Sequence, residues 1–442
     1  MRFRPSLMVL VVMTATSGLR PATAQTDTAS RPEKLSLDQA ERLALENHPA
    51  LREAEAAVEA AEAQIKQARA NYYPQLSFSG IGKIGLSGAT GALGLAGFPG
   101  SPFFRNLASS ANWYQTIFDF GRTRHHAASR ESLANLTRFK RQAEQDRIKH
   151  AVRRAYFSVL EARRLQRLAD KTVDERQLTL ARVQAYFQAR LRSQLDVRLA
   201  EANLAEAQGD LIRVRSAVRT SEAALQAAMG VEGESRYELE EPAAEITPPP
   251  SLQELLASAR TNRPDLNAAE AKVAAFSAQV GATEAERRPE IRGFAAGGQG
   301  RFQGTPVKEN QRHGLGALGI IFPFFTGGRL KGQEEEARAE LKGAMAAHDA
   351  LRQHVRLEVT AAHSQVLASQ EAIRAAGEQE RAAGDALRLA QARFQARLAS
   401  FLELTTAEVT LTRAETNHAR ALYDYRKAWA DLDFSIGPAN IP

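Results

Sequence analysis

The chain has 442 residues, of which 44% are hydrophobic and 25% are charged, and it contains no cysteine. The lack of cysteine excludes disulfide bonds and thiolate chemistry. The formal net charge is +7, but residues 1–24 contain three arginines and no acidic residue, so the remainder carries only +4. Such a small surplus, with acidic and basic residues interspersed, does not indicate a nucleic-acid-binding protein.

Residues 1–24 have the features of a secretory signal peptide. Arg2 and Arg4 make the start basic, residues 7–13 form an apolar run, and Ala22-Thr-Ala24 is a small-x-small cleavage site. A buried N-terminal helix is the alternative interpretation. No later run reaches the ~18 apolar residues that a membrane-spanning helix requires. The sequence therefore predicts an exported protein whose mature chain begins at residue 25.

The rest of the chain contains two similar halves. A shift of 207 residues superimposes residues 187–191 on residues 394–398, and a shift of 215 superimposes Ser36 on Ser251 and Pro74 on Pro289. The shift changes only between residues 74 and 121, where one half has a longer loop. Internal duplication of this kind predicts a first repeat over 25–238, a Pro-rich, stiff and extended linker over 239–251, and a second repeat over 252–442.

Each repeat begins with two helices. Ser36 and Ser251 each open a capping box, which predicts the start of a short helix. Each short helix ends at an Asn-x-Pro sequence, because a residue before proline avoids helical angles. A second helix, rich in Ala and Glu, follows over about 50–71 and about 265–287, and Pro74 and Pro289 end these helices.

After each proline the hydrophobic period changes from helical to two. In residues 75–87 Leu76, Phe78, Ile84 and Leu86 alternate with mostly polar positions, as in a strand with one apolar face. Weaker alternation predicts further strands at about 107–118, 291–302 and 313–322. Loops rich in Gly, Pro and Ser, at about 87–106 and 303–312, separate the members of each pair.

These strands have two interpretations. An ordinary soluble sheet packed on helices is one. The other is a membrane barrel, because strands of ~9–11 residues that alternate apolar and polar side chains are typical of outer-membrane barrels. Four strands cannot close a barrel, since about eight is the smallest workable number. Together with the signal peptide and the duplication, the pattern favours a barrel shared among several chains.

A very long helix follows each strand pair. Residues 122–187 contain neither proline nor glycine. From Ile148 the apolar residues recur at steps of four and three, a period near 3.5 that is typical of helices packed side by side over their whole length. At 1.5 Å per residue this helix is ~100 Å long. A helix returns after residue 193, and the sequence thus predicts long hairpins over 121–230 and 328–437.

This pattern resembles the TolC-like outer membrane efflux proteins over essentially the whole mature chain. The most specific matches are residues 37–49 from LDQA to NHP, YYPQL at 72–76, IFDFGR at 117–122 and LDV at 195–197. The family usually has Val-Gly-Leu at the hairpin turn. This chain has Ala189-Arg190-Leu191 there, and Ala396-Arg397-Leu398 in the second half. The second half also has Leu402-Glu403-Leu404 in place of Leu-Asp-Val.

The resemblance implies a mainly α fold with a membrane β part. Three chains would close a 12-stranded β-barrel in the outer membrane, and twelve long helical staves would form a coiled-coil barrel through the periplasm. The implied partners are outer membrane lipid, a periplasmic adaptor (membrane fusion protein) and, through it, an inner-membrane pump. The residues alone do not choose three chains over two, because eight strands also close a barrel.

The resemblance also suggests functional residues at the hairpin ends. Asp196 and Glu403 are equivalent under the shift of 207, and matching acids in the family help to constrict and charge the periplasmic mouth. The alternative is that they are helix-start acids, stabilised by the helix dipole. The candidate adaptor-docking residues are Ala189, Arg190, Leu191, Arg192, Ser193, Ala396, Arg397, Leu398 and Ser400, and we expect the three arginines to be exposed.

No enzymatic motif is present. The sequence lacks a nucleophile elbow, a phosphate-binding loop and a metal-spaced cluster, so we expect no catalytic residue, cofactor or metal. The neighbours His125 and His126 point apart on a helix, and His354 and His363 face opposite sides. Trp113 and Tyr114 suit either an interfacial aromatic belt or simple packing.

Three hypotheses follow. The leading one is a passive outer-membrane exit duct of a tripartite efflux or type I secretion system. The alternative is a periplasmic coiled-coil adaptor or scaffold without a pore, although an adaptor has one helical hairpin rather than two tandem copies. A secreted hydrolase is the third.

Overall fold

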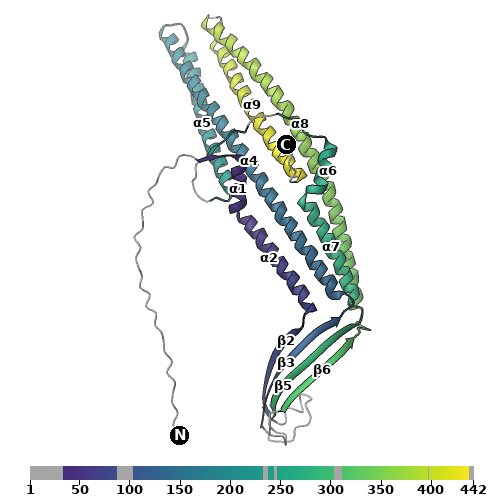
Figure 1. The fold of residues 1–442 in the computed structure, drawn as a ribbon. Coiled ribbons are helices and arrows are strands. Elements are labelled where there is room, and N and C mark those ends of the chain that lie inside the picture. Colours follow the sequence, from purple (N-terminus) through teal and green to yellow (C-terminus); the bar gives the residue numbers. More distant parts are fainter. Residues whose placement is uncertain are drawn as a thin grey trace, which may run out of the picture.

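A computed structural model shows an elongated molecule in which long helices lie side by side and a β-sheet covers one end (Figure 1). The structure describes residues 33–86, 103–231, 237–242, 246–302, 311–396 and 398–437. The expected signal peptide and most of the loops expected between the paired strands lie outside these residues. Among the helices of these ranges, none combines the length and the apolar character needed to cross a membrane.

The two halves contain corresponding elements. The long helices α4 and α8 have 67 residues each, and the returning helices α5 and α9 have 36 each. In chain order the elements are β1 (Glu33–Leu35), α1 (Leu37–Asn47), α2 (Pro49–Arg69), the short 3-10 helix η1 (Ala70–Tyr72), β2 (Gln75–Leu86), β3 (Phe103–Phe118), α4 (Arg122–Gln188), α5 (Gln194–Met229), β4 (Tyr237–Leu239), α6 (Leu252–Asn262), α7 (Pro264–Ala285), β5 (Glu290–Phe302), β6 (Gln311–Ile321), α8 (Arg329–Gln395) and α9 (Phe401–Ile436).

Local sequence signals explain where these helices begin. The capping boxes at Ser36 and Ser251 are present, with reciprocal bonds to Gln39 and Glu254. The long helices instead begin after Gly121 and Gly328, whose φ angles of 90° and 86° are left-handed. Glycine adopts this conformation without steric cost, so the chain can turn sharply from a strand into a helix there.

The helices form a wall of four columns, which we call staves. A stave is either one long helix or two shorter helices that lie end to end. Helix α4 packs against α2 and α5 on one side and against α7 and α9 on the other, and α8 packs against α7 and α9 (Figure 1). Helices α5 and α2 lie end to end, as do α9 and α7. The order across the wall is therefore α5 with α2, then α4, then α9 with α7, and finally α8.

Two glycines make the end-to-end junctions possible. A Cβ placed on Gly230, after α5, would lie 2.8 Å from the Cα of His48, just before α2. A Cβ on the equivalent Gly437 would lie 2.9 Å from the carbonyl carbon of Asn262, near the start of α7. Both glycines have positive φ angles, 65° and 80°. Any side chain at either position would therefore separate the two helices of a stave.

The four long strands form one antiparallel sheet in the order β2-β3-β5-β6. This order follows the staves, because β2 follows α2, β3 leads into α4, β5 follows α7 and β6 leads into α8. Strands β3 and β5 join the two halves. Within the described ranges, β2 pairs only with β3 and β6 only with β5, so the sheet has two unpaired edges.

One face of the sheet is apolar and exposed. Leu76 and Phe78 on β2 are 79% and 77% exposed, and Leu318 and Ile320 on β6 are 75% and 72% exposed. The register places these four side chains on one face, together with Trp113 of β3.

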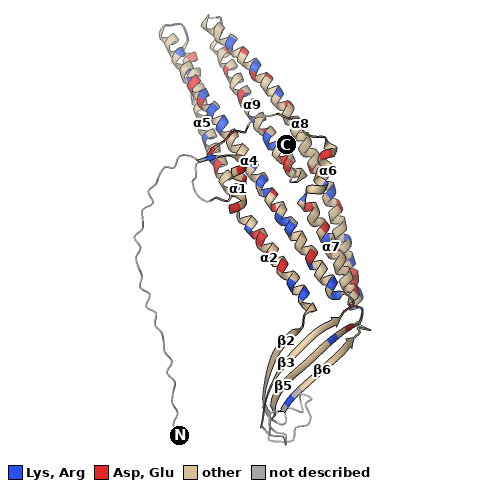
Figure 2. Ribbon diagram, viewed as in Figure 1, with Lys and Arg blue, Asp and Glu red and all other residues tan. Residues whose placement is uncertain are grey.

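The opposite face carries polar contacts near β2. The hydroxyls of Ser79 and Ser110 lie 2.9 Å apart, and the Asn112 amide donates to Ser79 at 3.2 Å. Figure 2 shows few charges on the strands and both signs interspersed along the helices. The sheet thus separates an apolar face from a more polar one.

The two residues considered for an aromatic belt lie on opposite faces of β3. The Trp113 ring lies over Gly293, whose added Cβ would be 2.9 Å from the ring. Tyr114 pairs with Phe294, with ring centroids 5.0 Å apart, and is 48% exposed. Trp113 is therefore packed within the sheet, while Tyr114 keeps one side open.

The segment between the halves is fastened to the helices. Strand β4 pairs in parallel with β1, a contact that the sequence analysis did not predict. Tyr156 of α4 donates to the Glu240 carbonyl at 2.6 Å and lies 2.9 Å from the Leu35 carbonyl. Tyr425 of α9 donates to the Thr247 carbonyl at 2.8 Å. Beyond β4 the described part of the segment forms no helix or strand, and its backbone polar groups are partly satisfied by these side chains.

The junction glycines generate a first prediction. Replacing Gly230 with Ala should lower the free energy of unfolding by at least about 2 kcal/mol, because the methyl group meets the His48 backbone and φ is left-handed. Guanidinium unfolding followed by circular dichroism measures the change. The matched control is Gly343→Ala in α8, where nothing lies within 4 Å and better helix propensity should add about 0.5–1 kcal/mol. Equal shifts for the two variants would contradict the junction.

Candidate functional site: the hairpin tips and the contact between hairpins

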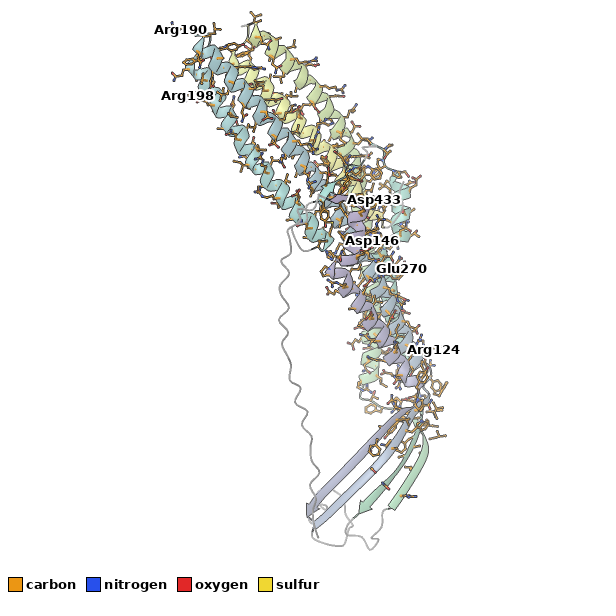
Figure 3. All side chains as sticks on the ribbon, turned by 60° about the vertical axis from the view of Figure 1, so that its left-hand side comes forward. Arg124, Asp146, Arg190, Arg198, Glu270 and Asp433 are labelled. Atoms are coloured by element: carbon orange, nitrogen blue, oxygen red, sulfur yellow. The ribbon has the colours of Figure 1, made fainter. Side chains whose placement is uncertain are left out.

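The first hairpin, α4 with α5, turns through an Arg in a left-handed conformation. The Leu191 N–H donates to the Tyr186 carbonyl and the Arg190 N–H to the Phe187 carbonyl, both at 2.8 Å. These two bonds define a Schellman motif, whose left-handed residue is usually glycine. Here it is Arg190, with φ of 60°. Figure 3 shows Arg190 at the far end of the hairpin, so its cation is placed at the extreme tip.

The second hairpin, α8 with α9, turns in a similar way. The Leu398 N–H donates to the Arg393 carbonyl at 2.8 Å, which is the counterpart of the bond made by Leu191. Leu398 is 71% exposed. Arg397, the third arginine expected at the tips, lies outside the described residues. Ser193 and Ser400 cap the two returning helices by accepting from the backbone N–H of Asp196 and Glu403.

The two candidate mouth acids make different contacts. Asp196 accepts from both the backbone N–H and the hydroxyl of Ser193, at 3.1 and 3.0 Å, so it completes a capping box. Glu403 instead lies 3.7 Å from the guanidinium of Arg393. Each acid therefore interacts with its own hairpin. These contacts agree with a helix-start role for Asp196, and they leave Glu403 half-exposed beside a cation.

The tips of the two hairpins pack against each other. Arg192 lies over the Phe394 ring at 4.2 Å and donates to the Ala399 carbonyl at 3.3 Å. Phe394 is only 6% exposed, whereas its equivalent Phe187 is 43% exposed. The remaining buried members of this cluster are Val183, Ala200, Ala399, Phe401 and Leu404.

This packing corrects one expectation. Arg192 was expected to be exposed with Arg190 and Arg397, but it is half-buried and holds the two tips of one chain together. A cation over an aromatic face gains electrostatic stabilisation that increases as water is excluded. The repeat pattern could not reveal this contact, since it treats Phe187 and Phe394 as equivalent. To predict this contact, one would need to know that Arg192 lies next to Phe394 in the folded chain.

Ion pairs continue this contact along the antiparallel helices α4 and α9. We call this α4–α9 contact the internal seam. Arg176 of α4 and Glu408 of α9 form a pair whose side chains are only 8% and 13% exposed. The further pairs of the seam are Arg154 with Asp431 at 2.7 Å, Glu161 with Lys427 at 2.9 Å and Lys171 with Glu415 at 2.8 Å. The two hairpins are therefore fixed in one register.

A groove with apolar and charged lining residues runs beside the internal seam. A cavity of about 730 Å³ lies between α4, α5 and α9. Its charged lining includes Arg176, Glu206, Asp210, Arg213 and Arg413. Apolar residues, among them Leu165, Leu168 and Val214, line much of the rest.

The seam ends near the middle of the molecule at Asp433 (Figure 3). Arg153 donates to Glu41 at 2.5 Å and to Asp433 at 3.0 Å, which joins α1, α4 and α9. Burial raises the pKa of Asp433 to about 6. Burial alone would also raise the pKa of Asp431, but hydrogen bonds from His150 and Arg154 lower it below its ordinary value. Neighbouring carboxyls thus favour opposite protonation states.

The neighbouring histidines His125 and His126 occupy packing positions. The His125 ring fits against Gly281 of α7, where an added Cβ would lie 2.8 Å from the ring. His126 faces Glu286 at 4.0 Å, and burial lowers the pKa of His126. Across the ranges that the structure covers, no group of three or more His, Cys, Asp or Glu residues is placed to hold a metal ion.

Comparison with known proteins identifies a family match over most of the chain. The family model described as outer membrane efflux protein matches residues 41–231 and 255–438. The outer membrane efflux protein BepC of Brucella suis biovar 1 is 28% identical over 257 residues, which cover 58% of this chain and 55% of BepC. The chain therefore spans just over half the length of that relative.

Solved structures share the fold. CusC matches with a TM-score of 0.80 at 20% identity, over 96% of this chain and 99% of CusC. The outer membrane protein VceC of Vibrio cholerae matches with a TM-score of 0.79 at 22% identity, over 91% of this chain and 96% of VceC. The mostly helical fold described above is the fold of these TolC-like channel structures.

The buried ion pair generates a second prediction. Glu408→Gln should lower the free energy of unfolding by about 3 kcal/mol, because it removes the ion-pair partner of the buried Arg176. The double variant Arg176→Met, Glu408→Leu should recover most of that loss. The exposed pair of Arg374 with Glu371 supplies the control, since Glu371→Gln should cost less than about 0.5 kcal/mol. A double variant less stable than Glu408→Gln would argue against this interpretation.

Asp433 generates a third prediction. The pKa of Asp433 is about 6 in the folded chain, against an ordinary value of 3.8, so the folded state holds the proton more tightly. Stability should therefore fall, relative to Asp433→Asn, by about 2 kcal/mol as the pH rises from about 4 to about 6. Unfolding curves of the two proteins at pH 4, 5, 6 and 7 give the difference. A difference that does not vary with pH would exclude Asp433 as the titrating group.

Proposed function

The chain belongs to the outer membrane efflux protein family, and from that membership we propose that it is the outer-membrane exit duct of a tripartite efflux or type I secretion system. Three copies surround one pore that crosses the outer membrane and extends into the periplasm. The observation that carries the proposal is the sheet whose edges β2 and β6 have no partner in the described part of the chain, on a wall of four staves in the same order.

A sheet with free edges needs further strands. Unpaired backbone groups cannot remain in a lipid bilayer, where each costs several kcal/mol. Joining β6 of one copy to β2 of the next satisfies both edges, and three copies give twelve strands. The exposed Leu76, Phe78, Leu318 and Ile320 then face lipid as a continuous apolar band. Trp113 of β3 lies on the same face of the sheet.

The staves continue the ring below the sheet. Each copy supplies four, and the two repeats of the chain, 25–238 and 252–442, each supply two. Acidic and basic residues are interspersed along the helices (Figure 2), as expected for a tunnel wall with water on both sides. A duct of this kind is passive, and an inner-membrane pump provides the energy.

The tips are the docking end. Residues 189–193, 396 and 398–400 lie farthest from the sheet, and Arg190, Leu191 and Leu398 are exposed there. Helical hairpins recognise each other through such exposed ends, so a periplasmic adaptor binds here and links the duct to the pump. Asp196 and Glu403, near the same end, contribute negative charge to the mouth of the trimer.

The pore-free adaptor or scaffold is disfavoured by the same sheet. Two unpaired sheet edges and an exposed apolar face both promote aggregation in water, so they are not expected in a soluble scaffold. The chain works without a cofactor and is not an enzyme.

Planar bilayers and fractionation test the proposed function. Purified protein should require detergent, should behave as a trimer and should conduct ions across a bilayer. A monomer found freely soluble in the periplasmic fraction would overturn the proposal.

The mouth acids generate a fourth prediction. In the double variant Asp196→Asn, Glu403→Gln the preference of the pore for K⁺ over Cl⁻ should fall at least about twofold, because rings of carboxylates attract cations. Asn at 196 retains an acceptor for the cap of α5. Reversal potentials in a salt gradient measure the preference. The control variant Glu371→Gln, farther along α8, should leave the preference unchanged. An unchanged preference in the double variant would remove both acids from the mouth.

A further inference from the structure

The apolar face of the sheet contains a shallow trough. The large side chains of Leu76, Phe78 and Trp113 form one side of it. Its floor consists of small residues that the strand register places on the same face, namely Ala111, Ala295, Gly297, Gly314 and Gly316. A Cβ added to either of the two β6 glycines would meet nothing within 4 Å, so the space above this floor is open.

Two adjoining cavities outline the trough. The larger, of about 610 Å³, is lined by Leu76 and Trp113 among others. The smaller, of about 250 Å³, is lined by Gln299 and Arg312 among others. Both are also lined by Phe78, Ala111 and Gly297, so they are continuous. The trough therefore leads from large apolar side chains to a guanidinium group.

The basic end of the trough is the end of the sheet that lies farthest from the helices (Figure 1). Arg312 is the second residue of β6 and pairs with Gln299 of β5, and both side chains are exposed. Arg301 follows Gln299 by two positions on β5 and pairs with Leu107, and Arg105 precedes Leu107 by two positions on β3. Positions two apart on a strand belong to one face. Three neighbouring strands thus each have an arginine position at this end.

The strands provide no acid to balance these arginines on this face. In the sequence of the four long strands the single acidic residue is Glu290. Its carboxylate accepts from Thr116 at 3.2 Å and from Arg292 at 2.7 Å, and these residues lie on the opposite face, beside Tyr114 and Phe294. The outer end of the apolar face is therefore positively charged.

The depth of Arg312 suits a lipid headgroup. In the proposed duct the apolar face meets lipid, and Arg312 is eight residues from Ile320 on the same strand. That separation is ~27 Å along the strand and ~20 Å along the membrane normal at the usual strand tilt. The apolar band of an outer-membrane barrel is ~25 Å tall. A long arginine side chain spans the remaining distance, so its cation reaches the headgroups of the outer leaflet.

We propose, on the basis of the function proposed above, that the trough binds a phosphorylated lipid of the outer leaflet. The phosphate lies at Arg312, because a guanidinium matches the oxygens of a phosphate bidentately. The acyl chains lie over Ala295 and Gly297, in space that larger side chains would fill, and against Phe78 and Trp113. A lipid whose headgroup carries no net charge binds more weakly at this basic end.

Lipid binding to delipidated trimers in detergent tests the proposal. Native mass spectrometry measures the affinity for hexa-acylated diphosphoryl lipid A, with phosphatidylethanolamine and inorganic phosphate as comparison probes. Arg312→Gln removes the cation, and Gly316→Leu fills the trough. The matched control Gly319→Leu adds the same side chain on the opposite face of β6, where nothing lies within 4 Å either. Arg374→Gln, on an exposed part of α8, is the control for loss of a cation.

The natural protein should bind lipid A at least about tenfold more tightly than phosphatidylethanolamine. Arg312→Gln and Gly316→Leu should each weaken lipid A binding at least about fivefold, while the two controls change it less than about twofold. Equal affinity for both lipids, or unchanged binding by Arg312→Gln, would overturn the proposal. Inorganic phosphate that binds as tightly as lipid A would also overturn it, since the site would then be a simple anion site.

Two further outcomes separate this inference from the proposed function. A trimer that conducts ions but binds no lipid A would refute the inference alone. A protein that is monomeric or needs no detergent would refute the proposed function. If Gly316→Leu prevents trimers from forming, Gly314→Leu replaces it, because that position lies on the same floor.

Discussion

The structure depends on the backbone of two strands. Strands β2 and β6 each have one edge without a partner in the described chain, and the apolar side chains beside these edges are exposed. Backbone N–H and C=O groups need hydrogen bonds, and in a lipid environment only a closed sheet provides them all. The single chain is therefore a section of a wall, and its helices have to be understood as parts of a larger ring.

The staves of the helical part follow the same order as the strands of the sheet, and a few residues make this possible. Gly230 and Gly437 let two shorter helices meet end to end, so that each strand pair stands on two staves of similar length. The tyrosines Tyr156 and Tyr425 fasten the connecting segment across the middle. As a result the strands of the sheet and the staves below them follow the same order. A neighbouring copy can therefore extend the sheet and the helical wall together.

The two hairpins of a chain are more firmly joined than the repeat suggests. Ion pairs with little exposure, such as Arg176 with Glu408, hold α4 on α9, and Arg192 covers Phe394 at the tip. The equivalent surface of α8 carries leucines in place of charges. In a ring, one contact between hairpins lies within a chain and the other lies between neighbouring copies. The two halves of the chain are similar, but these two contacts differ.

Much of the fold could be predicted because its signals are local. Capping serines, helix-ending prolines and the change from helical to two-residue period lie within a few residues of the boundaries that they specify. Strand β2 covers residues 75–86 where alternation over 75–87 was expected, while β3 begins at 103, four residues before its expected start at 107.

Contacts between distant segments could not be predicted in the same way. The pairing of β1 with β4, the tyrosines on the connecting segment and the half-buried Arg192 join residues that are up to about two hundred positions apart. Matching the halves to each other made Phe187 and Phe394 look alike, although only Phe394 lies beneath Arg192. The roles of Asp196 and Glu403 at a mouth belong to the assembled ring, which a single sequence does not contain.

An electron cryomicroscopy map of the protein in lipid nanodiscs would test the closed ring most directly. The account predicts three copies around one bore, with β6 of each copy hydrogen-bonded to β2 of the next in a single twelve-stranded barrel. A map in which one copy stands alone, or in which β2 and β6 remain unpaired, would contradict it.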